Sequence, residues 1–277
     1  MTSSKLTFVG GGNMATSLIA GLIADGYDSQ LITVSDLDSE KLAQMAARFG
    51  IHPEPDNTKA IEDAGIVVLA VKPQVLESVA RGLAETLQKT QPLVISIAAG
   101  VQETILRDWL GGDVTLVRSM PNTPAMIQSG ATGLHAGPGV TDEQRDMAEN
   151  ILRAVGLTRW VDDEVQMDAV TAVSGSGPAY FFLIMEAMEA AAIEMGLDNE
   201  TARLLVLQTA LGASRMAMES SDSPATLREK VTSPGGTTER ALDILEEGKL
   251  RELFAKALRG AQTRSQELSN MLGHRLP

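Results

Sequence analysis

The sequence predicts an α/β protein in which a Rossmann-like doubly wound sheet is followed by an all-helical region. In the first half, short and nearly continuous apolar runs alternate with segments of helical periodicity, which is typical of strands buried on both faces of a parallel sheet. After about residue 163 this strand pattern ends and only helical patterns follow. We therefore expect an α/β domain over residues 1–163 and a helical domain over residues 164–277.

The strands and helices of the first domain can be expected in chain order. The five apolar runs span residues 6–10, 31–36, 66–71, 93–98 and 114–120. Helical spacing of apolar residues predicts helices between them over residues 13–24, 39–49 and 74–87. Two further runs, residues 131–136 and 157–162, flank a helical stretch over 141–155. Thr141 and Gln144 fit a capping box at the start of that stretch, and we expect the two runs at the far edge of the sheet.

The second domain is expected to consist of helices over residues 167–174, 179–195, 199–220, 224–231, 238–247 and 249–272. Residues 181–195 and 204–218 are apolar around most of the helix circumference, so they must be buried. A helical domain of about 110 residues offers limited interior. An obligate homodimer would supply the missing cover, whereas the alternative is a packed monomeric bundle with a central helix.

Composition excludes several classes of protein. The net charge of −13 disfavours binding to nucleic acid or to anionic membranes. The chain has no cysteine and three histidines far apart in sequence, so we expect no disulfide, no thiolate nucleophile and no metal site. Its start does not resemble a signal peptide, and it has no uninterrupted apolar run of about 18 residues. A cytoplasmic protein without a membrane span is expected.

The first predicted strand ends in GGGNMA, residues 10–15, which fits the dinucleotide pattern GxGxxG/A. Gly10 would permit the tight turn, Gly12 would let the backbone approach a pyrophosphate, and Ala15 would allow close helix packing. Asn13 and Met14 would open a helix whose free amides point at the phosphates. We expect these residues to bind a nucleotide cofactor.

The second predicted strand ends at Ser35 and Asp36, about 20 residues after the glycines, where the adenosine ribose is normally bound. A carboxylate there would accept hydrogen bonds from the ribose hydroxyls and favour NADH. Alternatively, Asp36 caps the helix that begins near residue 39. Ser35, Asn57 or Lys59 could still meet a 2′-phosphate, so both NADPH and NADH remain candidate cofactors.

Two further segments follow predicted strands. VKPQ places Val71, Lys72 and Pro73 beyond the carboxyl end of a strand, where ligands bind in open α/β sheets. Lys72 would then contact the nucleotide or remain a solvated loop lysine. MPNTP, residues 120–124, is rigid because of its two prolines. Its Asn122 is a candidate for the wall of the nicotinamide site, although the segment could be only a stiff connection.

The chain is poor in the general bases that alcohol dehydrogenases use. A protonated cyclic imine would remove that need, because it is already an electrophile. The segments VSGSGPAYFF, residues 173–182, and VTSPGGTTERAL, residues 231–242, both lead into helix N-termini, which favour a carboxylate. Ordinary N-capping is the alternative for each segment.

Taken together, VGGGNMA, VKPQ, MPNTP, VSGSGPAYFF and VTSPGGTTERAL resemble the Δ1-pyrroline-5-carboxylate reductase family along the whole chain. The resemblance implies reduction of 1-pyrroline-5-carboxylate to L-proline, the last step of proline biosynthesis, with NADPH or NADH. It also implies interlocked homodimers that assemble into decamers. Residues 231–242, called the signature segment below, would then face the nicotinamide across the substrate.

The same resemblance assigns substrate-binding residues within the signature segment. Amides or hydroxyls of Ser233, Gly235, Gly236 and Thr237 would bind the substrate carboxylate, and Thr238 would act as the catalytic residue near the ring nitrogen. Asp36 departs from the Ser, Thr or Arg common in relatives, so we expect NADH to be used at least comparably to NADPH.

Two other functions fit parts of the sequence. A hydroxyacid dehydrogenase would need a catalytic lysine or histidine in the helical half, but residues 167–195 contain neither. A non-enzymatic nucleotide sensor or a pyridoxal-phosphate-handling protein would need only the first half. The complete signature segment therefore favours the reductase.

Overall fold

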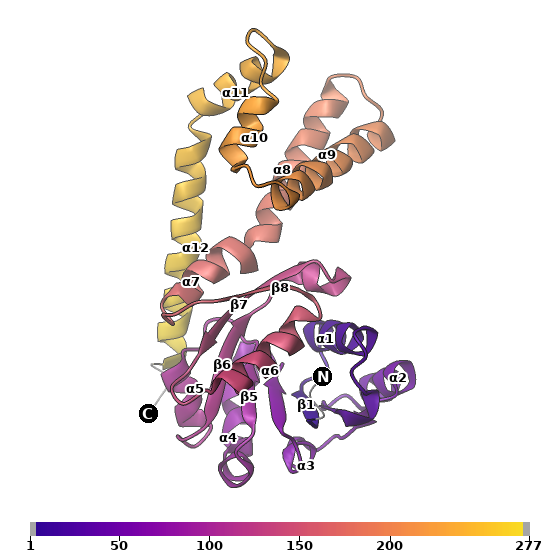
Figure 1. The fold of residues 1–277 in the computed structure, drawn as a ribbon, viewed down its shortest axis with the longest axis vertical. Coiled ribbons are helices and arrows are strands. Elements are labelled where there is room, and N and C mark those ends of the chain that lie inside the picture. Colours follow the sequence, from indigo (N-terminus) through magenta and orange to yellow (C-terminus); the bar gives the residue numbers. More distant parts are fainter. Residues whose placement is uncertain (1–3, 274–277) are drawn as a thin grey trace. The chain divides into compact units, whose positions relative to one another are not determined.

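The computed structural model describes residues 4–273. Its contacts divide this part of the chain into two compact units (Figure 1). The first unit comprises residues 4–176 together with 261–273, and the second comprises residues 177–260.

The first unit is built on one eight-stranded sheet. Its strand order is β3-β2-β1-β4-β5-β6-β7-β8, and all neighbours are parallel except the antiparallel pair β6 and β7. The chain order reverses between β1 and β4, which is the switch point where ligands bind in such sheets. The strands are β1 (Leu6–Val9), β2 (Ile32–Ser35), β3 (His52–Pro53), β4 (Ile66–Leu69), β5 (Leu93–Ser96), β6 (Thr115–Met120), β7 (Gly130–Ala136) and β8 (Gly156–Trp160).

Helices cover both faces of this sheet. Along β4, Ile66 and Val68 belong to one hydrophobic cluster, and Val67 and Leu69 belong to the other. Because side chains alternate along a strand, the near-continuous apolar run fills two cores. The helices of the unit are α1 (Asn13–Ala24), α2 (Ser39–Phe49), α3 (Asn57–Ile61), α4 (Pro73–Thr90), α5 (Glu103–Trp109), α6 (Asp142–Arg153), α7 (Gln166–Val170) and the end of α12 (Leu250–Gly273).

The predicted fold class and all seven predicted strands are confirmed. The capping box also forms, since Gln144 donates its amide to Thr141 Oγ1 at 3.3 Å and Thr141 donates its amide to Gln144 Oε1 at 3.0 Å. Three short elements, β3, α3 and α5, were not predicted. They contain two, five and seven residues, too few for periodicity to identify them.

The helix predicted over residues 167–174 is interrupted. After α7, which packs against β7, the chain forms a π-helical turn, Thr171–Gly175, whose Ser174 hydroxyl donates to the Ala131 carbonyl of β7. A Cβ on Gly133 would lie 2.5 Å from Val170 Cγ1, so only glycine permits this approach. Because these residues pack on the sheet, the first unit extends to residue 176, beyond the boundary expected after residue 163. That boundary remains a prediction of where the helical region begins.

The second unit contains α8 (Gly177–Glu194), α9 (Asn199–Glu219), α10 (Pro224–Lys230), α11 (Thr237–Glu247) and the start of α12. In the single chain, apolar side chains of α8 remain exposed to solvent: Phe181, Phe182 and Leu183 are 59%, 62% and 65% exposed. The burial expected for this helix is therefore not provided by its own unit. Among the described residues, no helix is both long and apolar enough to cross a membrane.

Candidate functional site

The glycine-rich turn lies at the switch point, between the end of β1 and the start of α1. Gly10 has φ +104°, and a Cβ there would lie 2.8 Å from the Ala70 carbonyl oxygen. Gly12 is the N-cap of α1 and has no side chain that could accept a bond from the first helical turn. A Cβ on Gly12 would have no neighbour within 4 Å. The first amides of α1 therefore face open space suited to an anion.

A cavity of about 670 Å³ opens at this turn and is called the dinucleotide cavity below. Three cationic side chains, those of Lys41, Arg48 and Lys72, line it, and no carboxylate appears among the described residues of its wall. An acidic protein thus gathers positive charge at one place, which favours a polyanionic ligand. The wall consists of Gly11, Gly12, Asn13, Met14, Thr16, Lys41, Gln44, Met45, Arg48, Phe49, Ala70, Val71, Lys72, Pro73, Ile97, Ala98 and Ala99.

Six of the predicted cofactor residues lie in this wall: Gly12, Asn13, Met14, Val71, Lys72 and Pro73. Ser35 does not, because its side chain is fully buried and its Oγ has no hydrogen-bond partner within the described chain. Asn57 begins α3 and also lies outside the wall. Both assignments to cofactor binding remain predictions without support from this geometry.

Asp36 is held by the protein itself. Its Oδ2 accepts hydrogen bonds from the Gly11 amide at 2.8 Å and from Lys41 Nζ at 2.7 Å. Its Oδ1 accepts the Asp38 amide at 3.0 Å. Burial raises the pKa of the Asp36 carboxyl, but the hydrogen bonds, first the one from Lys41, outweigh this effect and lower the pKa overall.

The alternative role for Asp36, as the cap of the second helix, is wrong. The N-cap of α2 is Asp38, whose side chain accepts the Lys41 amide at 3.0 Å. Asp36 instead joins the glycine turn to the first turn of α2. Two carboxylates two residues apart thus have different tasks.

Sequence reasoning missed the contribution of α2 to the cavity. Lys41, Gln44 and Arg48 follow one another at spacings of three and four residues, which places them on one helical face. That spacing was a usable signal. The guanidinium of Arg48 also stacks 4.7 Å from the centroid of the Phe49 ring, which restricts its orientation.

Asn122 connects elements rather than lining the dinucleotide cavity. Its Oδ1 accepts the Ala131 amide at 2.9 Å, and its Nδ2 lies 3.2 Å from both the carbonyl oxygen and Oγ of Ser174. Both ends of the carboxamide are therefore used inside the first unit. Its predicted contact with the cofactor remains untested, and its visible role is structural.

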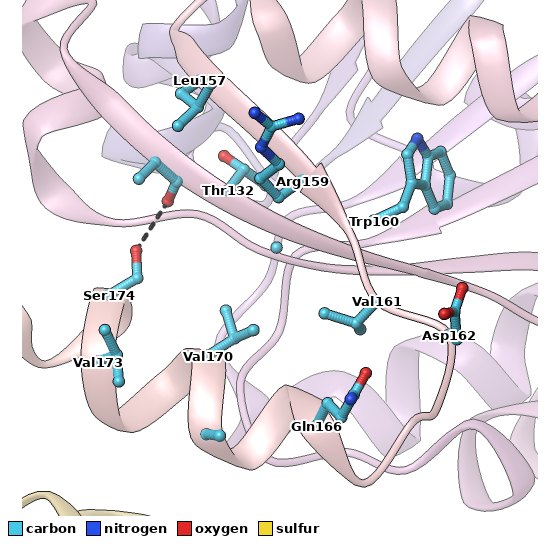
Figure 2. Close-up of a pocket in the computed structure, with 13 residues that line it drawn as sticks. Thr132, Leu157, Arg159, Trp160, Val161, Asp162, Gln166, Val170, Val173 and Ser174 are labelled. Carbon is cyan, nitrogen blue, oxygen red and sulfur yellow. Dashed lines mark hydrogen bonds between the residues drawn. The ribbon is translucent and has the colours of Figure 1, made fainter. Parts of the chain in front are cut away.

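Two of the other cavities in the first unit border residues 171–176. One of about 520 Å³ shares Pro73 and Ala99 with the dinucleotide cavity and is bounded by Thr171, Ser176 and the end of α12. The other, of about 660 Å³, lies between strands β7 and β8 and the α7 segment. Figure 2 shows this second cavity, where the Ser174 hydroxyl donates to the Ala131 carbonyl at 3.1 Å and Arg159 projects from β8. Of the predicted site residues, none lines this second cavity.

The signature segment forms a tight turn before α11 in the second unit. Gly235 has φ +71°, and α11 begins at Thr237 after the N-cap Gly236. The Gly235 amide donates to Glu239 Oε2 at 2.7 Å, and the Gly236 amide donates to the Ser233 carbonyl at 3.0 Å. Two of the predicted carboxylate-binding amides are therefore engaged within the turn.

Glu239 was not predicted to take part. It stands at the third position of α11 and reaches back over the helix start, in the manner of half a capping box. The spacing of an N-cap glycine and a glutamate three residues later was the available signal. The contact fixes the conformation of Gly235 and leaves the hydroxyls of Thr237 and Thr238 at the helix N-terminus.

Comparison with known proteins decides the family. A model of the pyrroline-5-carboxylate reductase dimerisation domain matches residues 164–268, and one of the coenzyme F420-dependent NADP oxidoreductases matches residues 5–100. A pyrroline-5-carboxylate reductase of Pseudomonas aeruginosa is 48% identical over 273 residues, which cover 99% of this chain and 100% of the relative. The chain belongs to the pyrroline-5-carboxylate reductase family.

Solved structures agree with this family. The pyrroline-5-carboxylate reductase of Coxiella burnetii superposes with a TM-score of 0.94 at 50% identity, covering 97% of this chain and 99% of that chain. The pyrroline carboxylate reductase of Plasmodium falciparum with NADP bound gives a TM-score of 0.85 at 27% identity, with coverage of 97% and 99%. The predicted resemblance and fold class are confirmed. As a pyrroline-5-carboxylate reductase family member, the chain is an oxidoreductase with a domain for oligomerisation.

Proposed function

We propose that this chain reduces 1-pyrroline-5-carboxylate to L-proline with a reduced nicotinamide dinucleotide. The observation that carries the proposal is the dinucleotide cavity, in which a glycine turn, free helix amides and three cations meet at the switch point of the sheet. The proposal therefore stands on the site as well as on the family.

The residues of the cavity fit a dinucleotide. The glycine turn would hold the pyrophosphate against the amides of Asn13 and Met14. The turn requires glycine at position 10, because a side chain there would collide with the Ala70 carbonyl. Lys72, at the N-cap of α4, would balance the charge of the pyrophosphate. When bound, the reduced nicotinamide supplies the hydride that is added to the imine carbon.

The signature segment would bind the substrate carboxylate and orient the ring. The Thr237 amide and the hydroxyls of Ser233 and Thr237 would donate to the carboxylate, while Gly235 and Gly236 would shape the turn. Thr238 would hydrogen-bond near the ring nitrogen. The nitrogen of a protonated imine already carries its proton, so the side chains need only position the electrophile and stabilise the transition state.

Removal of the Thr238 hydroxyl tests this assignment. We expect Thr238→Ala to lower kcat about 10-fold or more, the scale of one good hydrogen bond lost in the transition state. The measurement is oxidation of NADPH and NADH, followed in parallel with racemic 1-pyrroline-5-carboxylate. Thr238→Ser should restore most of the rate, and Thr90→Ala, on an exposed turn of α4, is the matched control. Unchanged kinetics in Thr238→Ala would remove the residue from the mechanism.

The proposal also covers the oligomeric state of the chain and its location in the cell. The dimerisation domain supports a homodimer, and we propose that dimers assemble further into decamers, as the family resemblance implies. A cytoplasmic location is part of the same proposal.

A further inference from the structure

We infer that Lys41, held in place by Asp36, makes the dinucleotide cavity selective for a cofactor that carries a 2′-phosphate. The inference rests on the proposed function and names the specificity-determining group within it. It reverses the expectation that Asp36 favours NADH.

The Asp36 carboxylate has little capacity left for a ribose. A carboxylate that selects NADH must offer free oxygens to the ribose hydroxyls. Here both oxygens already accept hydrogen bonds from the protein: Oδ2 accepts two and Oδ1 accepts one. The Asp36 side chain is only 16% exposed, and Asp36 is not part of the cavity wall.

Lys41 covers Asp36 and presents charge to the cavity. Its ammonium has three donors, one of which points at Asp36 Oδ2 at 2.7 Å. The side chain is 39% exposed and lines the cavity. Donors therefore remain for a ligand, at a place fixed by an ion pair rather than on a free, mobile lysine.

The local charge balance favours an added phosphate. Asp36 and Lys41 neutralise each other, and Arg48 on the same face of α2 contributes a further positive charge. The N-terminus of α2 adds its own partial positive charge near Lys41. A 2′-phosphate would meet Arg48 and the remaining donors of Lys41, whereas the unphosphorylated ribose brings no anion to them.

Binding of cofactor fragments tests the inference without turnover. Adenosine 2′,5′-bisphosphate and adenosine 5′-diphosphate carry the same number of phosphates but differ in the 2′-phosphate. By titration calorimetry, we expect the wild-type chain to bind the 2′,5′-bisphosphate about 10-fold or more tightly, the scale of one charge-assisted hydrogen bond. Lys41→Gln should remove most of that preference while changing the affinity for the 5′-diphosphate less than about 2-fold.

Two further variants keep the experiment decisive. Lys41→Arg retains the cation and should retain the preference. Lys89→Gln is the matched control, because Lys89 pairs with Glu85 at 2.6 Å on α4 but lies outside the cavity. Equal affinity of the wild-type chain for the two fragments would overturn the inference. An equal loss of affinity for both fragments in Lys41→Gln would overturn it as well.

The same variants separate this inference from the proposed function. In the reductase assay, Lys41→Gln should raise KM for NADPH about 10-fold and leave KM for NADH nearly unchanged. If no pyrroline substrate were reduced but the fragment preference and its loss persisted, the proposed reaction would fail and the cofactor selectivity would stand. If the substrate were reduced but the ratio of KM for NADPH to KM for NADH were the same in wild type and Lys41→Gln, the proposed reaction would stand and the role of Lys41 in selectivity would fail.

Discussion

The Asp36 carboxylate joins two segments that lie far apart in sequence. It accepts hydrogen bonds from Gly11 in the glycine turn and from Asp38 and Lys41 at the start of α2. Hydrogen bonds to a charged group are stronger than those between neutral groups. One side chain thus positions both the phosphate-binding turn and the cationic face of α2.

The lowered pKa of Asp36 predicts how its contribution changes with pH. The unfolded chain takes up the proton at higher pH than the folded chain, so acid favours unfolding. Wild type should exceed Asp36→Asn in free energy of unfolding at pH 7, and the difference should shrink as the pH falls below about 4. Urea unfolding of both proteins at several pH values measures this difference. The control is Asp146→Asn, which removes an exposed carboxylate of α6. A difference independent of pH would contradict the ionic role.

At the scale of elements, close packing joins β7 to α7 and to the π-helical turn that follows it. Gly133 permits close approach of Val170, and Asn122 bridges Ala131 of β7 to Ser174 of the turn. π-helical turns often occur at functional sites. This turn ends beside Ser176, which lines the cavity adjoining the dinucleotide cavity.

Loss of this bridge should destabilise the unit. Asn122→Ala leaves the Ala131 amide without its acceptor, and we expect a cost of about 1–3 kcal/mol in the free energy of unfolding. Asn150→Ala, an exposed asparagine on α6, should change stability by less than about 0.5 kcal/mol. Equal values for the two variants, measured by urea unfolding, would show that the bridge contributes nothing beyond a surface contact.

At the scale of the whole molecule, the second unit exposes more apolar surface than a monomer normally does. Large side chains of α8 and α9 are more than half exposed, among them Phe181, Phe182, Leu183, Leu204, Leu205 and Leu211. Such surfaces mark protein interfaces. The match to a dimerisation domain explains them.

We expect the wild-type chain to be at least a dimer at micromolar concentration, as measured by sedimentation velocity. The double variant Phe182→Asp with Leu205→Asp should dissociate or aggregate, because burial of an unpaired charge in an apolar interface is costly. Ile127→Asp, which changes an exposed apolar residue in the first unit, should keep the assembly of the wild type. A monomeric wild-type chain would contradict this prediction.

Several features of this molecule follow from neighbouring residues, and for that reason sequence alone predicts them. Alternation along residues 66–69 identifies a strand buried on both faces, and Thr141 with Gln144 identifies a helix start. The glycine turn after β1 follows from backbone conformations that only Gly10 tolerates at that place. These signals depend on contacts within a few residues, and the structure contains each of them.

The sequence by itself determined the change from an α/β region to a helical region, seven of the eight strands, the longer helices and the family motifs, because these follow from periodicity and local backbone preference. Only the tertiary structure decided which partners the site residues have. Asp36 meets Gly11 across 25 residues, and Asn122 meets Ser174 across 52 residues. Such partners depend on how distant segments pack, and a pattern read along the chain does not encode that packing. The same packing makes Asp36 the anchor of Lys41.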